Sequence, residues 1–140
     1  MKKYVCGLMF SSNKESVALI VKNKPDWQKG LLNGIGGKIE EFDSINAKNL
    51  KERSLNAMCR EFKEETGVET FPQNWNLFLT MGSDIGKAND ENIQQYNESW
   101  QVDFYRCFDD KVYNVQTQEE ENVVVRNICD LLSLNTIDYL

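Results

Sequence analysis

Three glutamates, Glu61, Glu64 and Glu65, lie close together in the stretch REFKEETGV, which ends at a glycine and a valine. If this stretch is helical, their carboxylates share one flank, because residues three and four apart lie on the same side of a helix. Glu61 and Glu65 then repel each other, and acids in the last turn also oppose the helix dipole. A neighbouring cation would relieve this cost, and Mg²⁺ prefers oxygen ligands. The alternative is a solvated acidic helix end.

Arg60 is the one basic residue placed to relieve the cluster, because it can pair with Glu64 four residues on. No basic residue on the expected helix lies four residues from Glu61 or Glu65. A second unusual stretch, NGIGGK at residues 33–38, lies upstream. Its glycines let the backbone approach a ligand or expose a carbonyl, although a tight turn would also use them.

The rest of the chain supplies the elements that must position these residues. Leu55, Met58, Cys59 and Phe62 form an apolar stripe at helical spacing, which predicts a helix over residues 53–66 that stops at Gly67. Nearly continuous apolar residues predict two strands buried on both faces. These and the further expected strands cover residues 4–10, 17–21, 31–35, 76–81, 100–108, 112–115 and 123–125. A loop over residues 83–99 and a short final helix over residues 128–134 complete a mixed α/β sandwich.

Composition limits the classes of function. The 140 residues are expected to form one domain, residues 1–140. A formal net charge of −6 argues against a nucleic acid polymer as partner. The chain has no histidine and no CxxC pair, so neither a zinc site nor a histidine-based triad is expected. No stretch has the length of a membrane span, and a cytoplasmic protein without a membrane partner is expected.

The acidic stretch resembles the signature of the Nudix hydrolase family, G-x5-E-x7-R-E-U-x-E-E-x-G-U, where U is bulky and apolar. Glu52, seven intervening residues and then residues 60–68 match this signature from its first glutamate onward. The resemblance implies a Nudix-type α/β/α sandwich with a mixed β-sheet. It also implies hydrolysis of a phosphoanhydride in a nucleoside diphosphate linked to another moiety, with Mg²⁺ or Mn²⁺ as the cofactor.

The resemblance also implies roles for the matched residues. Glu61 and Glu65 would be the main metal ligands, with Glu64 as an additional one and the carbonyl of Gly36 facing the metal. Arg60 would orient the glutamates or the loop. Many members add a late carboxylate, and the candidates here are Glu119, Glu120 and Glu121, among which we favour Glu120.

One departure concerns the spacing before the helix. The signature has five residues between its glycine and its first glutamate, whereas fourteen separate Gly37 from Glu52, and Asn46 stands where a strictly spaced glycine would be. We interpret the stretch FDSINAKNLK as carrying an insertion. In the family, the first glutamate helps to brace the loop, often with the signature arginine. Glu52 is assigned this role, and Asp43 is the competing residue at the ungapped spacing.

Substrate choice lies outside the signature. Asn33 directly before GIGGK resembles the MutT-like nucleoside triphosphate pyrophosphatases, some of which contact the base with an asparagine there. An asparagine can donate to and accept from a base edge, and turn formation is the alternative role of Asn33. Gly37 and Lys38 are candidate phosphate contacts, and Trp27 is a candidate to stack on a base or to pack structurally. The expected reaction is hydrolysis of a nucleoside triphosphate, such as an oxidised purine nucleotide, to the monophosphate and pyrophosphate.

Two alternatives stay open. A hydrolase of ADP-ribose or dinucleoside polyphosphates belongs to the same enzyme class, and a non-catalytic nucleotide-binding module belongs to another. The expected partner is a small nucleotide. A second subunit is also considered, because the chain ends shortly after the last expected helix, where relatives continue.

Overall fold

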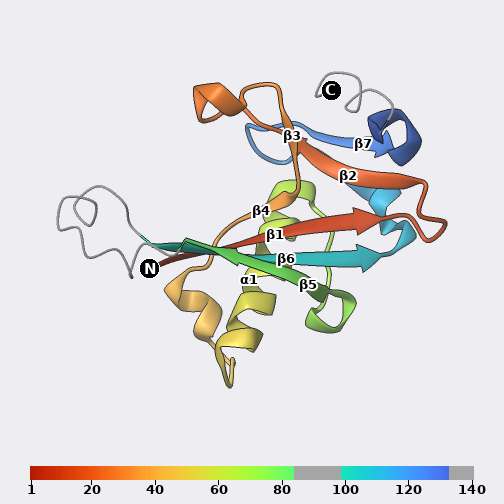
Figure 1. Ribbon diagram of the computed structural model, residues 1–140. Helices are drawn as coiled ribbons and strands as arrows, with labels where there is room; N and C mark the ends of the chain where they lie inside the picture. Colours follow the sequence, from red (N-terminus) through yellow and green to blue (C-terminus); the bar gives the residue numbers. More distant parts are fainter. Residues whose placement is uncertain (84–98, 133–140) are drawn as a thin grey trace.

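A long strand, β1 (Lys2–Phe10), lies at the centre of the sheet in the computed structural model, which describes residues 1–83 and 99–132 (Figure 1). Strand β6 (Trp100–Phe108) pairs with it in parallel along its whole length. On its other edge, β1 pairs antiparallel with β4 (Ile35–Lys38) and then with β2 (Ser16–Val21). The sheet is therefore mixed, and the glycine-rich stretch is part of it.

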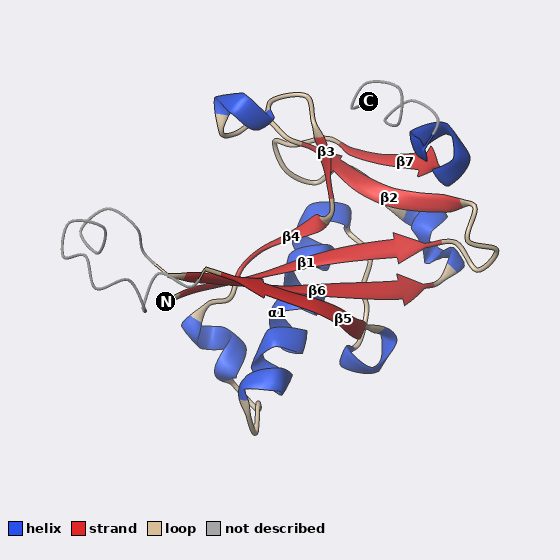
Figure 2. Ribbon diagram, in the orientation of Figure 1, coloured by secondary structure: helices blue, strands red, loops and turns tan. Residues whose placement is uncertain are grey.

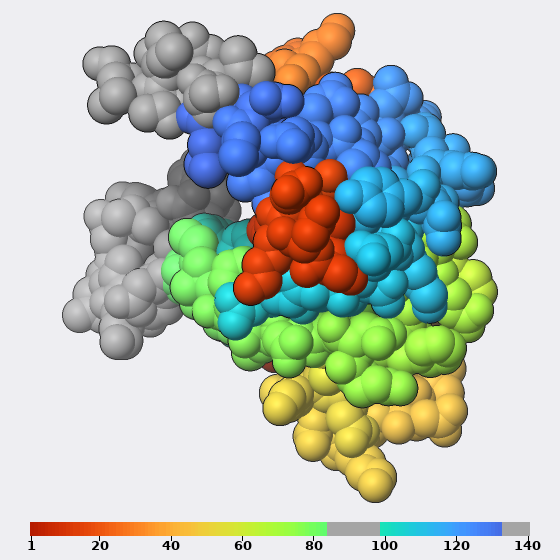
Figure 3. All heavy atoms as spheres, turned by 90° about the vertical axis from the view of Figure 1, so that its right-hand side faces the viewer, coloured from red at the N-terminus to blue at the C-terminus, as the bar shows by residue number. Residues whose placement is uncertain are grey.

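The remaining strands extend the sheet on both sides (Figure 2). Strand β2 pairs antiparallel with β3 (Leu32–Asn33) and β7 (Val123–Asn127), while β5 (Asn76–Gly82) pairs antiparallel with β6. The order along the main path is β3-β2-β1-β6-β5, which makes β5 an edge strand. Seen from the side, the turn after β1 lies beside the residues that follow β6 (Figure 3).

One long helix, α1 (Leu50–Thr66), packs against β1 and β4. It begins one turn earlier than predicted because the Asn49 side chain caps it, accepting a hydrogen bond from the amide of Glu52 at 2.9 Å. It ends as predicted at Gly67, which has a φ of 78°. A glycine tolerates that left-handed conformation without strain.

The buried face of α1 differs slightly from the predicted stripe. Its buried residues are Ser54, Ala57, Met58, Phe62 and Thr66, whereas Leu55 and Cys59 are only partly buried. The buried face of the helix is displaced from the predicted stripe toward Ser54, because the Ser54 hydroxyl forms hydrogen bonds with residues of the sheet. It lies 2.6 Å from the Tyr105 hydroxyl and donates to the Asp103 carboxylate at 2.7 Å.

The core forms between α1 and the face of β1 that carries Val5, Gly7 and Met9. A Cβ at Gly7 would lie 2.6 Å from the end of the Met58 side chain, so the helix approaches the strand closely there. Strand β1 therefore buries one face fully and the other only in part, whereas β2 is buried throughout its centre. The prediction that both strands are buried on both faces is wrong for β1.

Most other predicted elements are confirmed, including strands β5, β6 and β7 and the mixed α/β fold. The strand predicted at residues 112–115 is wrong, because Asp110–Asn114 forms a 3-10 helix, η5. The Asp109 side chain caps η5 by accepting from the amide of Lys111 at 2.9 Å, and Val112 is fully buried. Residues 128–132 are helical, as predicted. The rest of that helix and most of the predicted loop lie outside the described residues. Within residues 1–83 and 99–132, every helix is too short or too polar to cross a lipid bilayer.

Candidate active site

Arg60 lies at the centre of a network that joins α1 to the segment after β4. Its guanidinium donates to both oxygens of the Asp43 carboxylate, from Nε at 2.8 Å and from Nη2 at 3.0 Å. Nη2 also donates to the carbonyl of Lys38 at 3.0 Å, and the guanidinium lies over the ring of Phe42. Asp43 is only 4% exposed and also accepts from the amide of Glu40. This bidentate ion pair fixes the segment against the helix.

The structure corrects the expectation for Glu52. The Glu52 carboxylate accepts from the amide of Lys48 at 2.6 Å, at the start of α1, whereas the arginine contacts Asp43. Asp43 follows Gly37 after five residues, as the first acid of the signature does. The nine additional residues therefore lie after Asp43, between the 3-10 helix η2 (Glu41–Ser44) and Arg60. Spacing alone did not show on which side of the insertion the bracing acid stands.

Arg60 also contacts two of the three helix glutamates. Its Nη1 donates to Glu61 at 3.0 Å and to Glu64 at 3.2 Å. The Glu64 pair was predicted, but the Glu61 pair was not, because adjacent helix residues do not normally face each other. Burial raises the pKa of Glu61 in spite of this arginine, which lowers it. The arginine therefore neutralises part of the acidic flank and also holds the Glu61 carboxylate in place.

Glu65 has no such partner. Its Oε2 is buried and makes no hydrogen bond among the described residues. Burial, followed by the charges of Glu61, Glu119 and Glu121, raises the pKa of Glu65 to about 8. A buried carboxylate oxygen without a donor is costly unless a proton or a cation compensates it. Glu65 is therefore the position at which the protein most clearly lacks a positive group.

The glycines of β4 allow this flank to approach the sheet. A Cβ at Gly37 would lie 2.5 Å from the carboxylate carbon of Glu61, so only glycine leaves room for that side chain. A Cβ at Gly36 would instead overlap the backbone carbonyl of Val5. The run is therefore a strand packed against the acidic flank of α1, rather than only a turn.

We expect Gly37→Ala and Gly36→Ala to fail in different ways. At Gly37 the added methyl meets the flexible end of Glu61, so the fold should survive while Glu61 is displaced. At Gly36 it meets backbone, so overpacking should lower the free energy of unfolding by about 1–3 kcal/mol or more. Denaturant unfolding of both variants checks this. Equal stability losses would contradict the assignment of Gly37 to the site.

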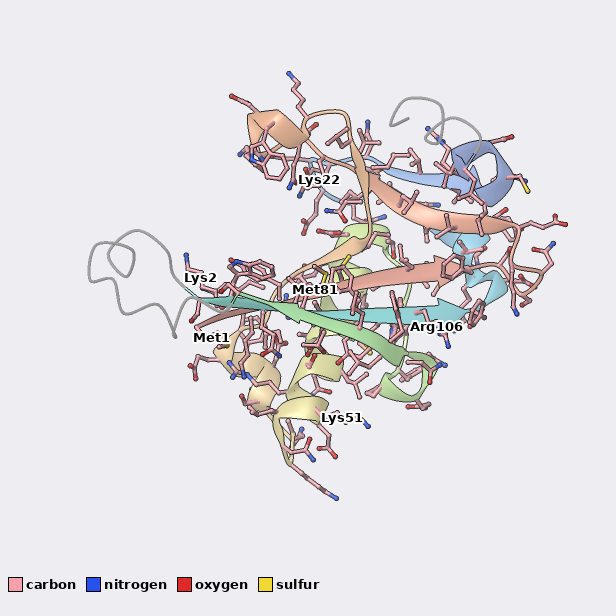
Figure 4. The ribbon with its side chains drawn as sticks, viewed as in Figure 1. Met1, Lys2, Lys22, Lys51, Met81 and Arg106 are labelled. Atoms are coloured by element: carbon pink, nitrogen blue, oxygen red, sulfur yellow. The ribbon has the colours of Figure 1, made fainter. Side chains whose placement is uncertain are left out.

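The late acids lie opposite the helix glutamates. Glu65 and all three candidates line a cavity of about 360 Å³, here called the acidic cavity, together with Ile20, Asn23 and Lys24. The charge of Glu119 raises the pKa of both Glu61 and Glu65. Glu121 is held by Lys22 at 3.2 Å and by the amide of Asn23 at 2.5 Å. Lys22 follows directly after β2 (Figure 4). We therefore favour Glu119 over Glu120, because the charge of Glu119 acts on both helix acids and Glu121 is already paired.

The candidate nucleotide-binding residues do not all lie together. Asn33 and Gly37 line a second cavity, here called the strand cavity, of about 220 Å³. Its other lining residues are Tyr4, Val5, Cys6, Lys22, Gly34, Gly36, Val102 and Phe104. It lies close to the acidic cavity, because the charges of Glu65 and Lys22 both act on the Cys6 thiol. The Asn33 side-chain oxygen accepts from the amide of Gly34 at 2.8 Å, as the turn-forming interpretation expects.

Lys38 and Trp27 lie outside the strand cavity. Lys38 is exposed at the end of β4 and contributes its carbonyl to Arg60. Trp27 lies in the 3-10 helix η1 (Asp26–Gln28) and is 75% exposed, so it is not packed into the core as its structural interpretation requires. Its indole is free to meet a ligand or solvent.

A divalent cation fits the donor set at this flank. Among the described residues, no three side chains with acidic, sulfur or imidazole groups already converge on one metal position. The charges of Glu61 and Glu119 nevertheless act on Glu65, and Glu65 has an unpartnered buried oxygen. Oxygen donors without histidine or thiolate match a hard cation such as Mg²⁺, which keeps several of its waters. Glu61 and Glu65 would hold it, with Glu119 nearby.

Comparisons with known proteins identify the fold through solved structures rather than through the sequence. No model of a known protein family matches the sequence, and no curated protein matches it. Solved structures do match. A Nudix hydrolase from Alicyclobacillus acidocaldarius superposes with a TM-score of 0.70 at 10% identity, covering 98% of this chain and 83% of that one. The Nudix domain of Shewanella oneidensis NrtR, solved with ADP-ribose, superposes at 0.62 with 19% identity, covering 97% and 83%.

A MutT/Nudix family protein from Enterococcus faecalis also superposes at 0.62, with 18% identity. The match covers 90% of this chain but only 43% of that protein, so this chain spans less than half of its length. At these identities the comparison establishes the fold. The chain has the Nudix fold, as its acidic helix predicted.

Proposed function

We propose that this protein is a Mg²⁺-dependent Nudix hydrolase that converts a nucleoside triphosphate to the monophosphate and pyrophosphate. The observation that carries the proposal is the Glu65 oxygen, which is buried and unpartnered beside Glu61 on the flank that faces the glycine strand. An acidic helix end that only met solvent would not bury its carboxylates. Mn²⁺ is expected to substitute for Mg²⁺.

The residues at this site would have the following roles. Glu61 and Glu65 hold the cation, Glu64 and Glu119 add negative charge around it, and the Gly36 carbonyl is a further oxygen donor. Arg60 is a positioning residue, since it binds Asp43 on one side and Glu61 on the other. When bound, the cation neutralises phosphate charge and acidifies water. The proposed reaction would add one water across the bond between the α and β phosphates, which gives the monophosphate and pyrophosphate.

The proposed reaction does not need a protein nucleophile. Cys6 is the thiol that lines the strand cavity, and burial raises its pKa to about 11, which keeps it neutral at physiological pH. A neutral thiol is a poor nucleophile. The strand cavity is instead a binding site for the nucleoside, with Asn33 as the candidate contact to the base.

ADP-ribose is the second candidate substrate. The NrtR Nudix domain, which shares this fold, was solved with ADP-ribose. Both candidates contain a phosphoanhydride, so the acidic flank does not distinguish between them. The difference must lie outside the acidic flank, and the strand cavity is the candidate place for it.

A panel of nucleotides would test the proposal. The purified chain would be incubated with normal and oxidised nucleoside triphosphates, ADP-ribose and dinucleoside polyphosphates, with Mg²⁺, Mn²⁺ or a chelator. We expect pyrophosphate and monophosphate from a triphosphate only when a divalent ion is present. Turnover of ADP-ribose or dinucleotides alone would overturn the triphosphate proposal. A folded chain that binds nucleotide without turning over any of them would be a binding module.

A further inference from the structure

We propose that a cavity at the start of α1, here called the basic cavity, binds a small phosphate dianion, either as the free ion or as a monoester. The cavity has a volume of about 350 Å³, and its walls come from the first turns of α1 and from β1, β5 and β6. Its charged lining residues are Lys3, Lys51, Arg53 and Asp103. The inference does not depend on the proposed hydrolase activity, because none of the helix glutamates lines this cavity.

The Arg53 side chain carries a buried donor without an acceptor. In the part of the chain that the structure describes, two buried side-chain nitrogen or oxygen atoms make no hydrogen bond, and these are Nε of Arg53 and Oε2 of Glu65. A guanidinium keeps its charge in proteins, so a buried N–H group is costly until an acceptor compensates it. Glu65 lacks a positive group near the end of α1, and Arg53 lacks a negative group near its beginning.

The basic side chains of the cavity are not neutralised by the protein. Lys3, Lys51 and Arg53 make no ion pair with any acid in residues 1–83 and 99–132. Asp103 is the acid that lines the cavity, and its carboxylate already accepts from the hydroxyl of Ser54 at 2.7 Å and from two further side chains. Three positive charges therefore meet one negative charge, which leaves the lining with a net charge of +2.

Two further acids lie near Arg53 without pairing with it. Glu40 and Glu41 line a neighbouring cavity of about 310 Å³, to which Arg53 and Lys3 also contribute. Neither acid makes an ion pair with a basic residue that the structure describes. The Arg53 guanidinium is therefore free to turn toward an anion in the basic cavity.

A phosphate dianion matches these groups in charge and geometry. A phosphate monoester carries a charge of about −1.5 to −2 at pH 7, close to the opposite of the lining charge. An arginine donates two parallel hydrogen bonds to phosphate oxygens, while lysines act as point charges. Lys51 lies in the first turn of α1 (Figure 4), where the positive end of the helix dipole also favours an anion.

The rest of the lining leaves room for an organic group on the phosphate. Ile39, Leu50 and Leu77 provide an apolar wall, and the Tyr105 hydroxyl and the Gln101 side chain provide polar groups. Sites for small organic ligands measure about 300–1,000 Å³, and this cavity falls at the lower end of that range. The expected ligand is therefore a small phosphorylated molecule, with free phosphate as the simplest member of the class.

Calorimetric titration of the purified chain in the presence of a chelator would test this. Inorganic phosphate, glucose 6-phosphate and a nucleoside monophosphate would each be titrated at constant ionic strength. The chelator leaves the acidic flank without a divalent ion, so that flank should repel phosphate. At least one of the three compounds should bind with a dissociation constant below about 1 mM. Tighter binding of an ester than of inorganic phosphate would assign the site to an organic phosphate, and equal binding would assign it to the free ion.

Arg53→Gln should raise the dissociation constant at least about tenfold, because it removes a charge-assisted hydrogen bond. Arg106→Gln is the matched control. It makes the same chemical change, but Arg106 lines a different cavity beside Phe10 and Phe108 and should bind phosphate like the wild type. Failure of all three compounds to bind, or equal weakening by the two variants, would overturn the proposal.

Amide chemical shifts of the wild type give a second test that needs no variant. Addition of the tightest of the three compounds, again with chelator, should move the resonances of residues 51–54 and 101–105. The amides of Asn33 and Gly34, in the strand cavity, should not move. Shifts confined to the strand cavity or to residues 119–121 would place the phosphate elsewhere and overturn the proposal.

Discussion

Glu65→Gln is expected to remove nearly all hydrolysis while leaving the fold intact. The amide keeps the shape of the side chain but cannot supply the negative charge that the proposed cation needs. The expected fall in kcat is about 10²–10³-fold or more, as for removal of a single group that stabilises charge in a transition state. Turnover of the preferred nucleotide at saturating Mg²⁺ is the measurement.

Glu64→Gln is the matched comparison, because it makes the same chemical change on the same helix. Glu64 is more exposed and is already paired with Arg60, so a smaller fall in kcat is expected. If Glu64→Gln were as damaging as Glu65→Gln, the two acids would have equivalent roles. Full activity of Glu65→Gln would rule out the proposed site.

Glu65→Gln should be more stable than the wild type when divalent ions are chelated. The folded pKa of Glu65, about 8, lies above its ordinary value of 4.5. The folded state therefore binds the proton more tightly, and stability falls as pH rises from about 4.5 to 8. Glu65→Gln removes this loss of stability, because the amide does not titrate. Allowing for solvent screening, we expect a gain of about 1–2 kcal/mol at pH 8 and little gain at pH 4.

Asp43→Ala is expected to destabilise the protein strongly. Asp43 is almost fully buried, and its loss leaves the Arg60 guanidinium without its bidentate partner. Breaking a buried ion pair from one side typically costs about 3–5 kcal/mol. For a chain of this size, the unfolding temperature should fall on the order of 10 °C. Thermal and denaturant unfolding would measure the loss, and kcat should fall too because Arg60 also positions Glu61.

Glu52→Ala provides the control that separates the two candidate bracing acids. Glu52 accepts one hydrogen bond from the amide of Lys48 and lies in the first turn of α1. Its loss should cost about 1 kcal/mol or less. If Glu52→Ala were the more damaging substitution, the assignment of the brace to Asp43 would be wrong.

The sequence alone determined the features that depend on neighbouring residues. The position of α1, its end at Gly67 and the shared flank of the three glutamates all follow from helical spacing. Strands β1, β2, β5 and β6 were also predictable, because their apolar runs and alternation are local signals. The matched signature then led to the Nudix fold.

The tertiary structure decided which distant residues meet. Asp43 rather than Glu52 binds Arg60, because the additional residues lie between Asp43 and Arg60. Glu119 lines the same cavity as Glu65 because β7 pairs with β2 and places the preceding loop there. Val112 is in a 3-10 helix because Asp109 caps it. Spacing within one element is set by local backbone geometry, whereas contacts across loops depend on how the whole chain packs, and no local pattern encodes that.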